Sequence, residues 1–525
     1  MKDLRDFIKL LRDKGQLTVV DTPVDPVLEI TEIADRVVKA GGPALLFTKP
    51  RGSSFPVLIN QFGSDERMCL ALRAGSYDEL SARVEGLVSL EVPSGAWEKV
   101  KALSKLKDLA AVQPRSVKSG PCQEVVLTGD AVDLGALPIL QCWPLDAGRY
   151  VTLPLVFTRH PLTGRRNVGM YRLQVFDRNT TGMHWHIHKD AAEHYRVAAD
   201  QAAAGPSAFS RGDEGRSAAG AAGGGGRGRM EVAVAIGTDP AVTYAATAPV
   251  PGAIDEMTFA GFLRDEAVEM VQCKTVALEV PAHAEFVLEG YVDLDESRRE
   301  GPFGDHTGYY SLADDYPVLH LTALTHRRDA VYSTTIVGQA PMEDTYLGKA
   351  TERLFLPLLR ITLPELVDMD LPKEGGFHNC VLVSVDKRYP LHARKVIHAL
   401  WGTGQMQFAK CIVVVDGGVD VHDYAEVAWR VFNNVDWQRD VTIVEGPLDV
   451  LDHSSPHPLR GGKIGIDATT KWPEEGHDRE WPADVEMSSE VKARIDELWP
   501  SLGLSDLRSP GRNAAGPSAP GAPRG

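Results

Sequence analysis

The sequence predicts an α+β protein of several domains: an N-terminal α/β domain, a strand-rich central domain and a C-terminal α/β domain. Apolar residues recur at helical spacing in the first part, and short β-branched or aromatic runs between Gly, Pro and Asp turns fill the middle. Continuous apolar runs alternate with helical patterns towards the end. A length of 525 residues is enough for two to four domains with ample cores.

The N-terminal α/β domain is expected over residues 1–118. Residues 3–14 form an amphipathic pattern that predicts a helix, and residues 26–40 predict another. In the second helix Asp25 is suited to be the cap and Pro26 the first helical residue. Short apolar runs at 43–47 and 55–59 are typical of strands.

The central domain is expected over residues 119–330. Strand-type runs occur at 124–127, 150–157, 168–176, 231–236 and 286–292. So many strands in about 200 residues predict a barrel or a sandwich, interrupted by one helix near residues 259–270.

The C-terminal α/β domain is expected over residues 331–500. Residues 354–361 and 391–400 predict helices, whereas 380–385 and 411–415 are continuous apolar runs, as in a buried parallel sheet. Two segments are expected to be disordered. Residues 201–229 hold 17 Ala or Gly among 29, and residues 501–525 are rich in Pro, Gly, Ala and Ser.

Composition excludes several classes of function. A net charge of −16 disfavours a nucleic-acid binder. The chain has no apolar run of transmembrane length and no signal-peptide core. Its six cysteines are scattered without a CxxC pair, which indicates reduced thiols and a cytoplasmic protein. The sequence carries no P-loop and no dinucleotide-binding glycine fingerprint after a strand, so an NAD or ATP enzyme is disfavoured.

The most informative segment is residues 300–310. It places Glu300 and Asp305 five residues apart across Pro302, Phe303 and Gly304, a sequence that cannot continue a helix. A rigid turn would let the two carboxylates converge, and converging carboxylates can be driven to different pKa values, so that one holds a proton near neutral pH. That arrangement suits acid–base catalysis. The competing interpretation is a solvated loop with two surface acids.

Alternating histidines form a second cluster. His184, His186 and His188 would share one face of a strand. One interpretation is a zinc site, and another is a set of partly buried histidines that only form hydrogen bonds.

Several motifs, taken together, resemble the UbiD family of prenylated-flavin-dependent decarboxylases. They lie at residues 167–176, 181–190, 289–293, 300–310, 341–344, 404–406, 446–455 and 462–469, so the resemblance covers nearly the whole chain. It implies that the central domain is a split β-barrel that binds prenylated FMN. It also implies that residues 201–229 are an insertion in a surface loop.

The resemblance also implies a metal site. Its ligands would be Asn167, His188 and Glu256, holding Mn²⁺ (K⁺ is an alternative ion) against the cofactor phosphate. An amide oxygen, an imidazole and a carboxylate suit Mn²⁺ or Mg²⁺ better than structural zinc. The family often has an acidic residue where this chain has Gly252. The implied contacts to the flavin are Met170, Tyr171, Arg172, His184, Trp185, His186, His188, Lys189, Asp190 and Glu256.

The implied catalytic set is Arg172, Glu300 and Asp305. Arginine stays charged, so it would orient the substrate carboxylate or lower the pKa of a neighbouring acid. Asp305 is the expected proton donor, with Glu300 setting its pKa, and a raised pKa would help it deliver a proton into a dry pocket. Asn167 and Arg172 differ by five positions, so both reach one site only if the strand ends or bulges, and Gly169 is the expected place.

The resulting expectation is a non-oxidative carboxy-lyase that removes CO₂ from an aromatic acid through a covalent adduct with prenylated FMN. The motif at Asp305, His306 and Thr307 favours the branch that acts on 4-hydroxy-3-polyprenylbenzoate in ubiquinone biosynthesis. A long apolar channel would favour this substrate, and a small closed pocket would favour the alternative, a reversible decarboxylase of small phenolic or heteroaromatic acids.

Two further alternatives belong to other classes. One is a flavin-binding partner subunit without turnover, and the other is a metal-only hydrolase built on the histidine cluster. The expected partners are a flavin prenyltransferase that supplies the cofactor and further copies of the chain, as dimers or hexamers. Neither nucleic acid nor stable membrane insertion is expected.

Overall fold

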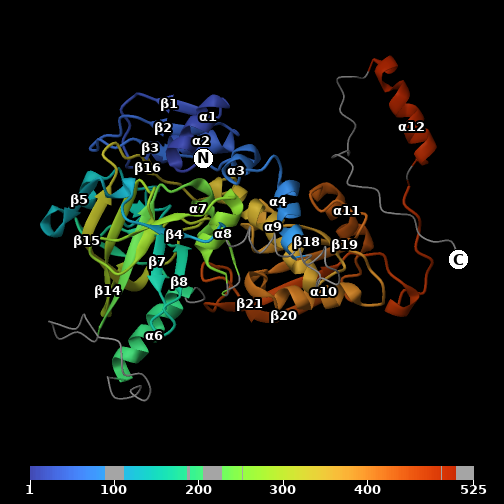
Figure 1. The fold of residues 1–525 in the computed structure, drawn as a ribbon. Helices are drawn as coiled ribbons and strands as arrows, with labels where there is room; N and C mark the ends of the chain where they lie inside the picture. The colour runs from blue at the N-terminus through green and yellow to red at the C-terminus, as the bar shows by residue number, and fades with distance from the viewer. Residues whose placement is uncertain are drawn as a thin grey trace, which may run out of the picture. The chain divides into compact units, whose positions relative to one another are not determined.

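The computed structural model describes residues 1–88, 111–185, 190–204, 228–250, 252, 254–485 and 487–503 (Figure 1). The chain divides into two compact units, Met1–Thr469 and Thr470–Gly525. The second unit contains the 3₁₀ helices η6 (Pro473–Glu475) and η7 (Trp499–Leu502) and the helix α12 (Ser489–Leu498). Of the predicted tail, residues 501 and 502 therefore belong to η7, and residues 504–525 lie outside the described part.

The N-terminal region contains a four-stranded sheet in the order β1-β2-β3-β16. Its strands are β1 (Leu17–Val20), β2 (Ala44–Phe47), β3 (Val57–Ile59) and β16 (Tyr332–Ser333). The last strand comes from beyond residue 330, so the sheet is completed by a segment that we expected in the C-terminal domain. The helices that the structure describes in this region are α1 (Leu4–Asp13), α2 (Glu29–Lys39), α3 (Asp65–Ala71) and α4 (Tyr77–Val88).

The two predicted N-terminal helices are present. Asp3 caps α1, because its side chain accepts hydrogen bonds from the backbone N–H groups of Arg5 and Asp6. The start predicted for α2 is wrong by three residues, since this helix begins at Glu29. Val27 instead forms a bridge with Gln141, and Leu28 has a positive φ of 67°. The pairing of Val27 with the distant Gln141 therefore overrides the local preference for a helix.

The central sheet has seven strands, in the order β10-β15-β14-β11-β7-β8 with β5 paired to β15. They are β5 (Val125–Thr128), β7 (Leu155–Arg159), β8 (Arg166–Met170), β10 (Thr180–Gly182), β11 (Arg229–Ile236), β14 (Phe286–Glu300) and β15 (Asp314–His326). In the described part of the chain no pairing links β8 back to β10, so the split-barrel prediction is not confirmed. Two smaller sheets are β13 (Glu279–Pro281)-β12 (Glu269–Gln272)-β4 (Arg115–Val117) and β6 (Tyr150–Val151)-β9 (Leu173–Gln174).

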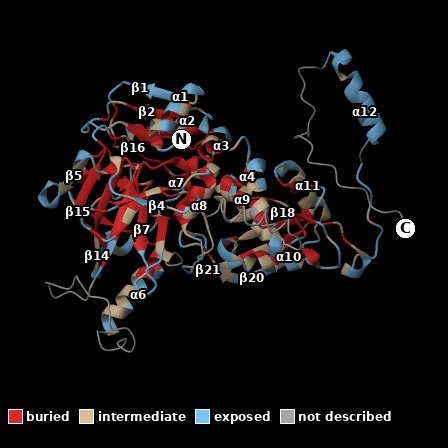
Figure 2. Ribbon diagram, in the orientation of Figure 1, coloured by how far each residue is buried: buried red, intermediate tan, exposed pale blue. Residues whose placement is uncertain are grey.

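Alternation along β11 shows how the central sheet is buried on both faces. Val232, Val234 and Ile236 belong to one apolar cluster, whereas Ala233 and Ala235 belong to another. Successive strand residues point to opposite faces, so each face packs against its own core. Figure 2 shows this burial along the central strands.

The central region contains more helix than predicted: α6 (Asp190–Ala204), α7 (Pro240–Ala245) and α8 (Glu256–Arg264). The helix predicted to reach residue 270 ends at Arg264, because Asp265 has a left-handed φ of 53° and Met270 belongs to β12. Residues 201–204 of the predicted disordered insertion are helical, and residue 229 begins β11. Residues 205–227 lie outside the described part.

The C-terminal region of the first unit has a five-stranded sheet in the order β17-β18-β19-β21-β20. Its strands are β17 (Leu366–Asp370), β18 (Cys380–Val385), β19 (Cys411–Asp416), β20 (Val441–Pro447) and β21 (Arg460–Asp467), with helices α9 (Glu343–Thr362), α10 (His392–Trp401) and α11 (Tyr424–Asn434). β18, β19 and β21 pair in parallel as predicted, but β17 and β20 pair antiparallel, so the sheet is mixed. The described residues of the first unit also form five short 3₁₀ helices: η1 (Pro121–Gln123), η2 (Gly129–Ala131), η3 (Leu134–Ala136), η4 (Lys373–Gly375) and η5 (Gly404–Phe408).

Within the described residues, none of the helices combines the length and apolar character needed to span a bilayer. All six cysteines are free thiols, and four of them are buried. The boundaries of the three predicted domains remain a prediction.

Candidate active site

Arg172 lies at a break between two short strands. β8 ends at Met170 and β9 begins at Leu173, so Arg172 does not follow the alternation of β8. The strand end that the sequence required is therefore present, but the break is not at Gly169, which stays in register opposite Val156. A Cβ on Gly169 would lie 2.4 Å from the ring of Tyr171, so glycine makes room for this ring.

The segment after Glu300 forms the predicted turn. Glu300 is the last residue of β14, the Gly301–Pro302 peptide is cis, and the N–H of Asp305 donates to the carbonyl of Tyr309 at 3.1 Å. Asp146 holds the turn from outside, because its carboxylate accepts a hydrogen bond from the Gly304 N–H at 2.8 Å. The turn thus brings the carboxylates of Glu300 and Asp305, five residues apart in the sequence, to the same side chain.

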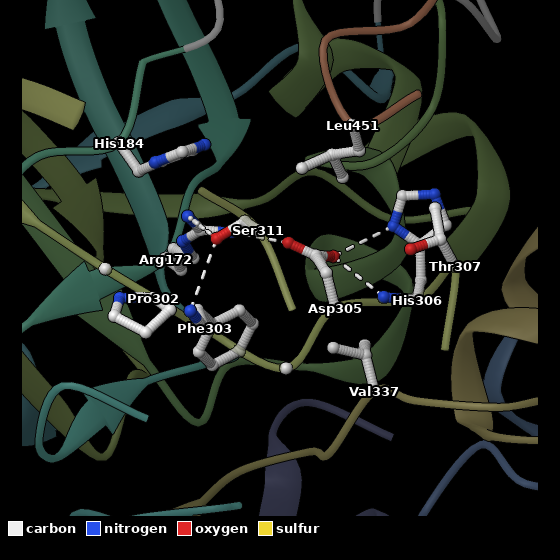
Figure 3. A network of polar contacts seen from close by, with 12 residues as sticks. Arg172, His184, Pro302, Phe303, Asp305, His306, Thr307, Ser311, Val337 and Leu451 are labelled. Atoms are coloured by element: carbon white, nitrogen blue, oxygen red, sulfur yellow. Dashed lines mark hydrogen bonds and ion pairs between the residues drawn. The ribbon is translucent and has the colours of Figure 1, made fainter. Parts of the chain in front are cut away.

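That residue is Arg172, whose side chain is nearly buried, with 8% of its surface exposed. It grips Glu300 through two bonds, Nε to Oε1 at 2.9 Å and Nη2 to Oε2 at 3.1 Å. Its Nη1 donates to Asp305, and Nη2 also donates to the Ser311 hydroxyl at 3.1 Å. Figure 3 shows Asp305 between Arg172 and His306. The sequence resemblance grouped the three charged residues, but nothing in it indicated Ser311.

Both carboxyl groups are acidic in this arrangement. Burial raises the pKa of Glu300, but hydrogen bonds from His184 and Arg172 and the arginine charge outweigh it and bring the pKa to about 2. Burial also opposes ionisation of Asp305, yet its hydrogen bonds and charge pairing with His306, together with Arg172, lower the pKa of this group. The expectation of a carboxyl group with a raised pKa is therefore wrong for both residues in this state.

His306 binds the other side of Asp305. Its backbone N–H and its ring Nδ1 lie 2.8 and 2.9 Å from Asp305 Oδ1. Its Nε2 lies 2.9 Å from Nε2 of His378, which precedes β18, and its ring stacks on Phe377 with centroids 5.2 Å apart. Asp344 in α9 is also close, and burial raises the pKa of this group to about 7. Sequence reasoning missed His378, because it is 72 residues from His306.

His184 binds Glu300 rather than forming part of a histidine-lined strand. β10 ends at Gly182, before His184, so the strand that would align the three histidines does not extend to the first of them. Its Nδ1 lies 3.0 Å from Glu300 Oε2, and burial lowers the pKa of this histidine, so the neutral ring donates to the carboxylate. His186, His188 and Lys189 lie outside the described residues. Asp190 begins α6 and pairs with Arg165 at 3.4 Å.

Two of the three predicted metal ligands lie close together. Asn167 is buried on β8, and Glu256 is the first residue of α8 and accepts a backbone hydrogen bond from Val168. Asp255, the cap of α8, pairs with both Arg166 Nε and Nη2 at 3.0 Å, which fixes this helix against β8. Burial raises the pKa of Glu256 to about 7, and its Oε2 has no hydrogen-bond partner among the described residues.

This geometry fits a bound cation and cofactor. A buried carboxyl group with one unpaired oxygen beside a buried amide lacks the positive charge that Mn²⁺ would supply. The buried indole N–H of Trp185 likewise has no acceptor among the described residues. Trp185 and Tyr171 belong to the same buried cluster. Such unpaired polar atoms are costly unless a ligand satisfies them.

A second acidic group lies in the C-terminal region. Glu352, Asp370 and His422 bring one ligand atom each within 4.8 Å of one another. The ammonium group of Lys349 already bonds to both carboxylates, so the positive charge there is supplied by the chain itself.

A cavity of about 550 Å³ adjoins His306 and opens between the central turn and the C-terminal region of the first unit. His306 and Tyr309 line it from the turn, and His378, Lys410, Asp452 and His453 line it from the C-terminal region. Its lining is mainly polar and includes both cationic and anionic side chains.

Comparison with known proteins matches this architecture over nearly all of the first unit. Three profiles, for the N-terminal, Rift-related and C-terminal domains of 3-octaprenyl-4-hydroxybenzoate carboxy-lyase (UbiD), match residues 8–84, 115–340 and 345–468. The chain belongs to the UbiD family. It is therefore an enzyme of the carboxy-lyase class, and the resemblance inferred from the motifs is confirmed.

Two relatives are similar to nearly the whole chain. An uncharacterized protein of Archaeoglobus fulgidus is 51% identical over 95% of this chain and 98% of its own length. An uncharacterized protein of Aquifex aeolicus is 49% identical over 96% of this chain and 99% of its own.

Three solved structures of two proteins are similar to nearly the whole chain. The closed form of vanillic acid decarboxylase from Sedimentibacter hydroxybenzoicus has a TM-score of 0.81 at 27% identity and covers 96% of this chain and 99% of its own. Its open form gives a TM-score of 0.73 at 28% identity, with 96% and 99% coverage. HmfF from Pelotomaculum thermopropionicum in complex with FMN has a TM-score of 0.73 at 29% identity and covers 93% of this chain and 99% of its own.

Proposed function

We propose that this UbiD-family enzyme decarboxylates an aromatic acid with prenylated FMN as its cofactor. The observation that carries the proposal is the buried network in which Arg172 binds both Glu300 and Asp305 beside a polar cavity. The similar solved proteins include a vanillic acid decarboxylase, and an evolved dimeric form of HmfF was solved in complex with prenylated FMN. An intact network of this kind also disfavours a non-catalytic flavin-binding subunit.

The residues that would hold the cofactor follow from the unpaired atoms described above. Asn167 and Glu256, with His188, would bind Mn²⁺, and the metal charge would hold the flavin phosphate. Met170, Tyr171, Arg172, His184, Trp185, His186, Lys189 and Asp190 would contact the flavin itself. When bound, the cofactor supplies a sink for the electron pair left as CO₂ departs. K⁺ remains an alternative ion for this site.

Arg172, Glu300 and Asp305 would have distinct roles. Arg172 already has both carboxylates as partners, so it organises the acids, and Glu300 fixes its guanidinium through two bonds. Asp305 would deliver a proton to the ring carbon that loses CO₂. Because Asp305 is ionised in this arrangement, it must first gain that proton, and water must be kept from the site while it does so.

The cavity bears on the substrate. Its polar lining of His306, His378, Lys410 and His453 suits an aromatic acid with hydroxyl, methoxy or ring-oxygen groups. This favours a small phenolic or heteroaromatic acid over a long polyprenyl tail, which would need an apolar channel. A 4-hydroxy-3-polyprenylbenzoate in ubiquinone biosynthesis remains the second candidate, since the matching family profiles carry that description.

The test is to express the full chain together with a flavin prenyltransferase. Absorbance and intact mass should show non-covalently bound prenylated FMN, and elemental analysis should show Mn²⁺. CO₂ release is then measured for vanillate, 3,4-dihydroxybenzoate, furan-2,5-dicarboxylate and a short-chain 4-hydroxy-3-prenylbenzoate. Folded protein that loads the flavin but releases CO₂ from none of them contradicts the proposal, and turnover without flavin would favour a metal-only hydrolase.

The proposal also includes four features that are expected from the sequence. They are a split β-barrel in the flavin-binding region, the three domains at residues 1–118, 119–330 and 331–500, assembly into dimers or hexamers, and a cytoplasmic location. Size-exclusion chromatography with light scattering measures the assembly directly.

A further inference from the structure

We propose that His378 is a positioning residue that holds His306 as the protonated partner of Asp305, so that the C-terminal region controls the proton that Asp305 delivers. The proposal rests on the proposed function and extends it, because it adds two histidines to the three residues of the buried network. It is carried by an unbroken line of contacts from the arginine to the cavity.

The first step is the short contact between the two imidazoles. Nε2 of His306 and Nε2 of His378 are 2.9 Å apart, so one hydrogen lies between them. On its other side His306 faces the Asp305 carboxylate with Nδ1, which must therefore carry a hydrogen as well. If His306 also carries the shared hydrogen, it is an imidazolium and His378 is the neutral acceptor.

The surrounding charges favour this assignment. Burial opposes the charge of His306, but Asp305, Asp344 and Asp449 outweigh it and raise the pKa of this histidine. Burial and the neighbouring His306 lower the pKa of His378 to about 4, against the opposite effect of Asp449, Asp452 and Asp305. Of the two rings, His306 is thus the one that carries the proton near neutral pH.

The contact joins two separate parts of the first unit. His306 belongs to the turn after β14, whereas His378 precedes β18 and is fixed there by Gly375, whose carbonyl accepts the N–H groups of both His378 and Asn379. Phe377, the neighbour of His378 in the chain, stacks on His306. The ring centroids of Tyr309 in the turn and His453 in the C-terminal region are 4.0 Å apart. The C-terminal segment is therefore linked to Asp305, the proton donor, through its contacts with the turn.

The proton balance of the step is simple. The Nδ1–H bond of His306 breaks and an O–H bond forms on Asp305, which leaves a neutral His306 that keeps its Nε2 hydrogen towards His378. Asp305 then gives the proton to the substrate carbon as CO₂ leaves. One proton from water in the cavity, which both imidazoles line, restores the array, so each CO₂ released consumes one solvent proton.

The test compares the full-length wild-type protein with His378→Phe, which keeps a ring but cannot accept a hydrogen bond. His378→Ala is a second removal variant in case the phenylalanine variant does not fold. His378→Gln should restore the contact, because its amide oxygen can accept the His306 Nε2 hydrogen. His398→Phe, at an exposed position on α10, is the matched control.

The primary measurement is the pKa of the His306 ring by NMR of ¹⁵N-histidine-labelled protein, with the signal assigned by its loss in His306→Gln. Removal of His378 should lower this pKa by about one unit, as expected when a charged group loses a buried hydrogen-bond acceptor. The glutamine variant should recover most of the shift, and the His398→Phe variant should show none. An unchanged His306 pKa in both removal variants overturns the proposal.

The second measurement is the dependence of kcat/KM on pH with prenylated-FMN-loaded enzyme. Since the array supplies a proton only while His306 is charged, a lower His306 pKa should move the alkaline limb towards acid by the same amount. A merely structural role for His378 would lower kcat/KM equally at every pH. If the wild type releases no CO₂ from any acid, the proposed function fails, whereas the NMR titration still decides the role of His378.

Discussion

Replacing Asp305 by asparagine tests the proposed proton donor most directly. Both oxygens of Asp305 accept hydrogen bonds: Oδ1 from the N–H and the ring of His306, and Oδ2 from Arg172. An amide has only one oxygen, so in either orientation its NH₂ group faces a donor and at least one of these contacts is lost. Leaving such a buried group unpaired costs about 1–3 kcal/mol in the free energy of unfolding.

The effect on catalysis should be larger than this structural loss. An amide cannot deliver a proton, and a positioned general acid contributes about 10²–10⁴-fold to the rate. We therefore expect kcat to fall by about 10²–10⁴-fold, which corresponds to about 3–5 kcal/mol in the activation barrier. The assay is CO₂ release by enzyme loaded with prenylated FMN, with rates normalised to the flavin absorbance of each preparation.

Ser311→Ala is the matched control. It removes a hydroxyl that accepts two hydrogen bonds, one from Arg172 Nη2 and one from the Phe303 N–H, but it leaves all three charged residues in place. Arg172 keeps its bonds to Glu300 and Asp305, and neither lost bond involves the transferred proton, so kcat should fall by about tenfold at most. If Asp305→Asn keeps kcat within about threefold of the wild type at equal flavin content, or falls no further than Ser311→Ala, Asp305 is not the donor.

Three further outcomes are expected. The pKa of Glu300 in the folded protein is about 2, below its ordinary value of 4.5. The ionised carboxylate therefore stabilises the fold by about 3 kcal/mol above pH 4.5, and this stability is lost as the pH falls towards 2. Urea unfolding at pH 5 and pH 3 should therefore show a smaller pH-dependent loss for Glu300→Gln than for the wild type, and equal losses would contradict the assigned ion pair. Glu256→Gln should reduce bound Mn²⁺ and flavin together by at least about tenfold, because it removes the only anionic ligand of the proposed metal set. Elemental analysis measures the Mn²⁺ and absorbance measures the flavin. Full occupancy would exclude Glu256 from the site. Gly304→Ala would place a Cβ 2.3 Å from Trp143 and should lower the free energy of unfolding by about 1–3 kcal/mol, whereas Gly462→Ala, with no atom within 4 Å, should have little effect.

Local patterns in the sequence were enough to predict most elements. The amphipathic helix at residues 4–13, the strands at 44–47 and 57–59, and the apolar strands β18 and β19 all follow from periodicity and composition. The errors arose where a distant segment competes with local preference. Val27 was predicted to be helical but forms a bridge with Gln141, and Met270 was predicted to be helical but pairs with Pro281 in a sheet.

For the candidate site, too, some features could be predicted from the sequence and others depend on the tertiary structure. The sequence by itself determined which residue types are available, since the motifs around Arg172, Glu300 and Asp305 identified the family and the charged network. Only the tertiary structure decided that Arg172 lies at a strand end, that Ser311 and Asp146 support the turn, and that His378 contacts His306. It also decided the ionisation, because the pKa of each carboxyl group depends on burial and on partners far away in the chain, and neither is encoded in local spacing.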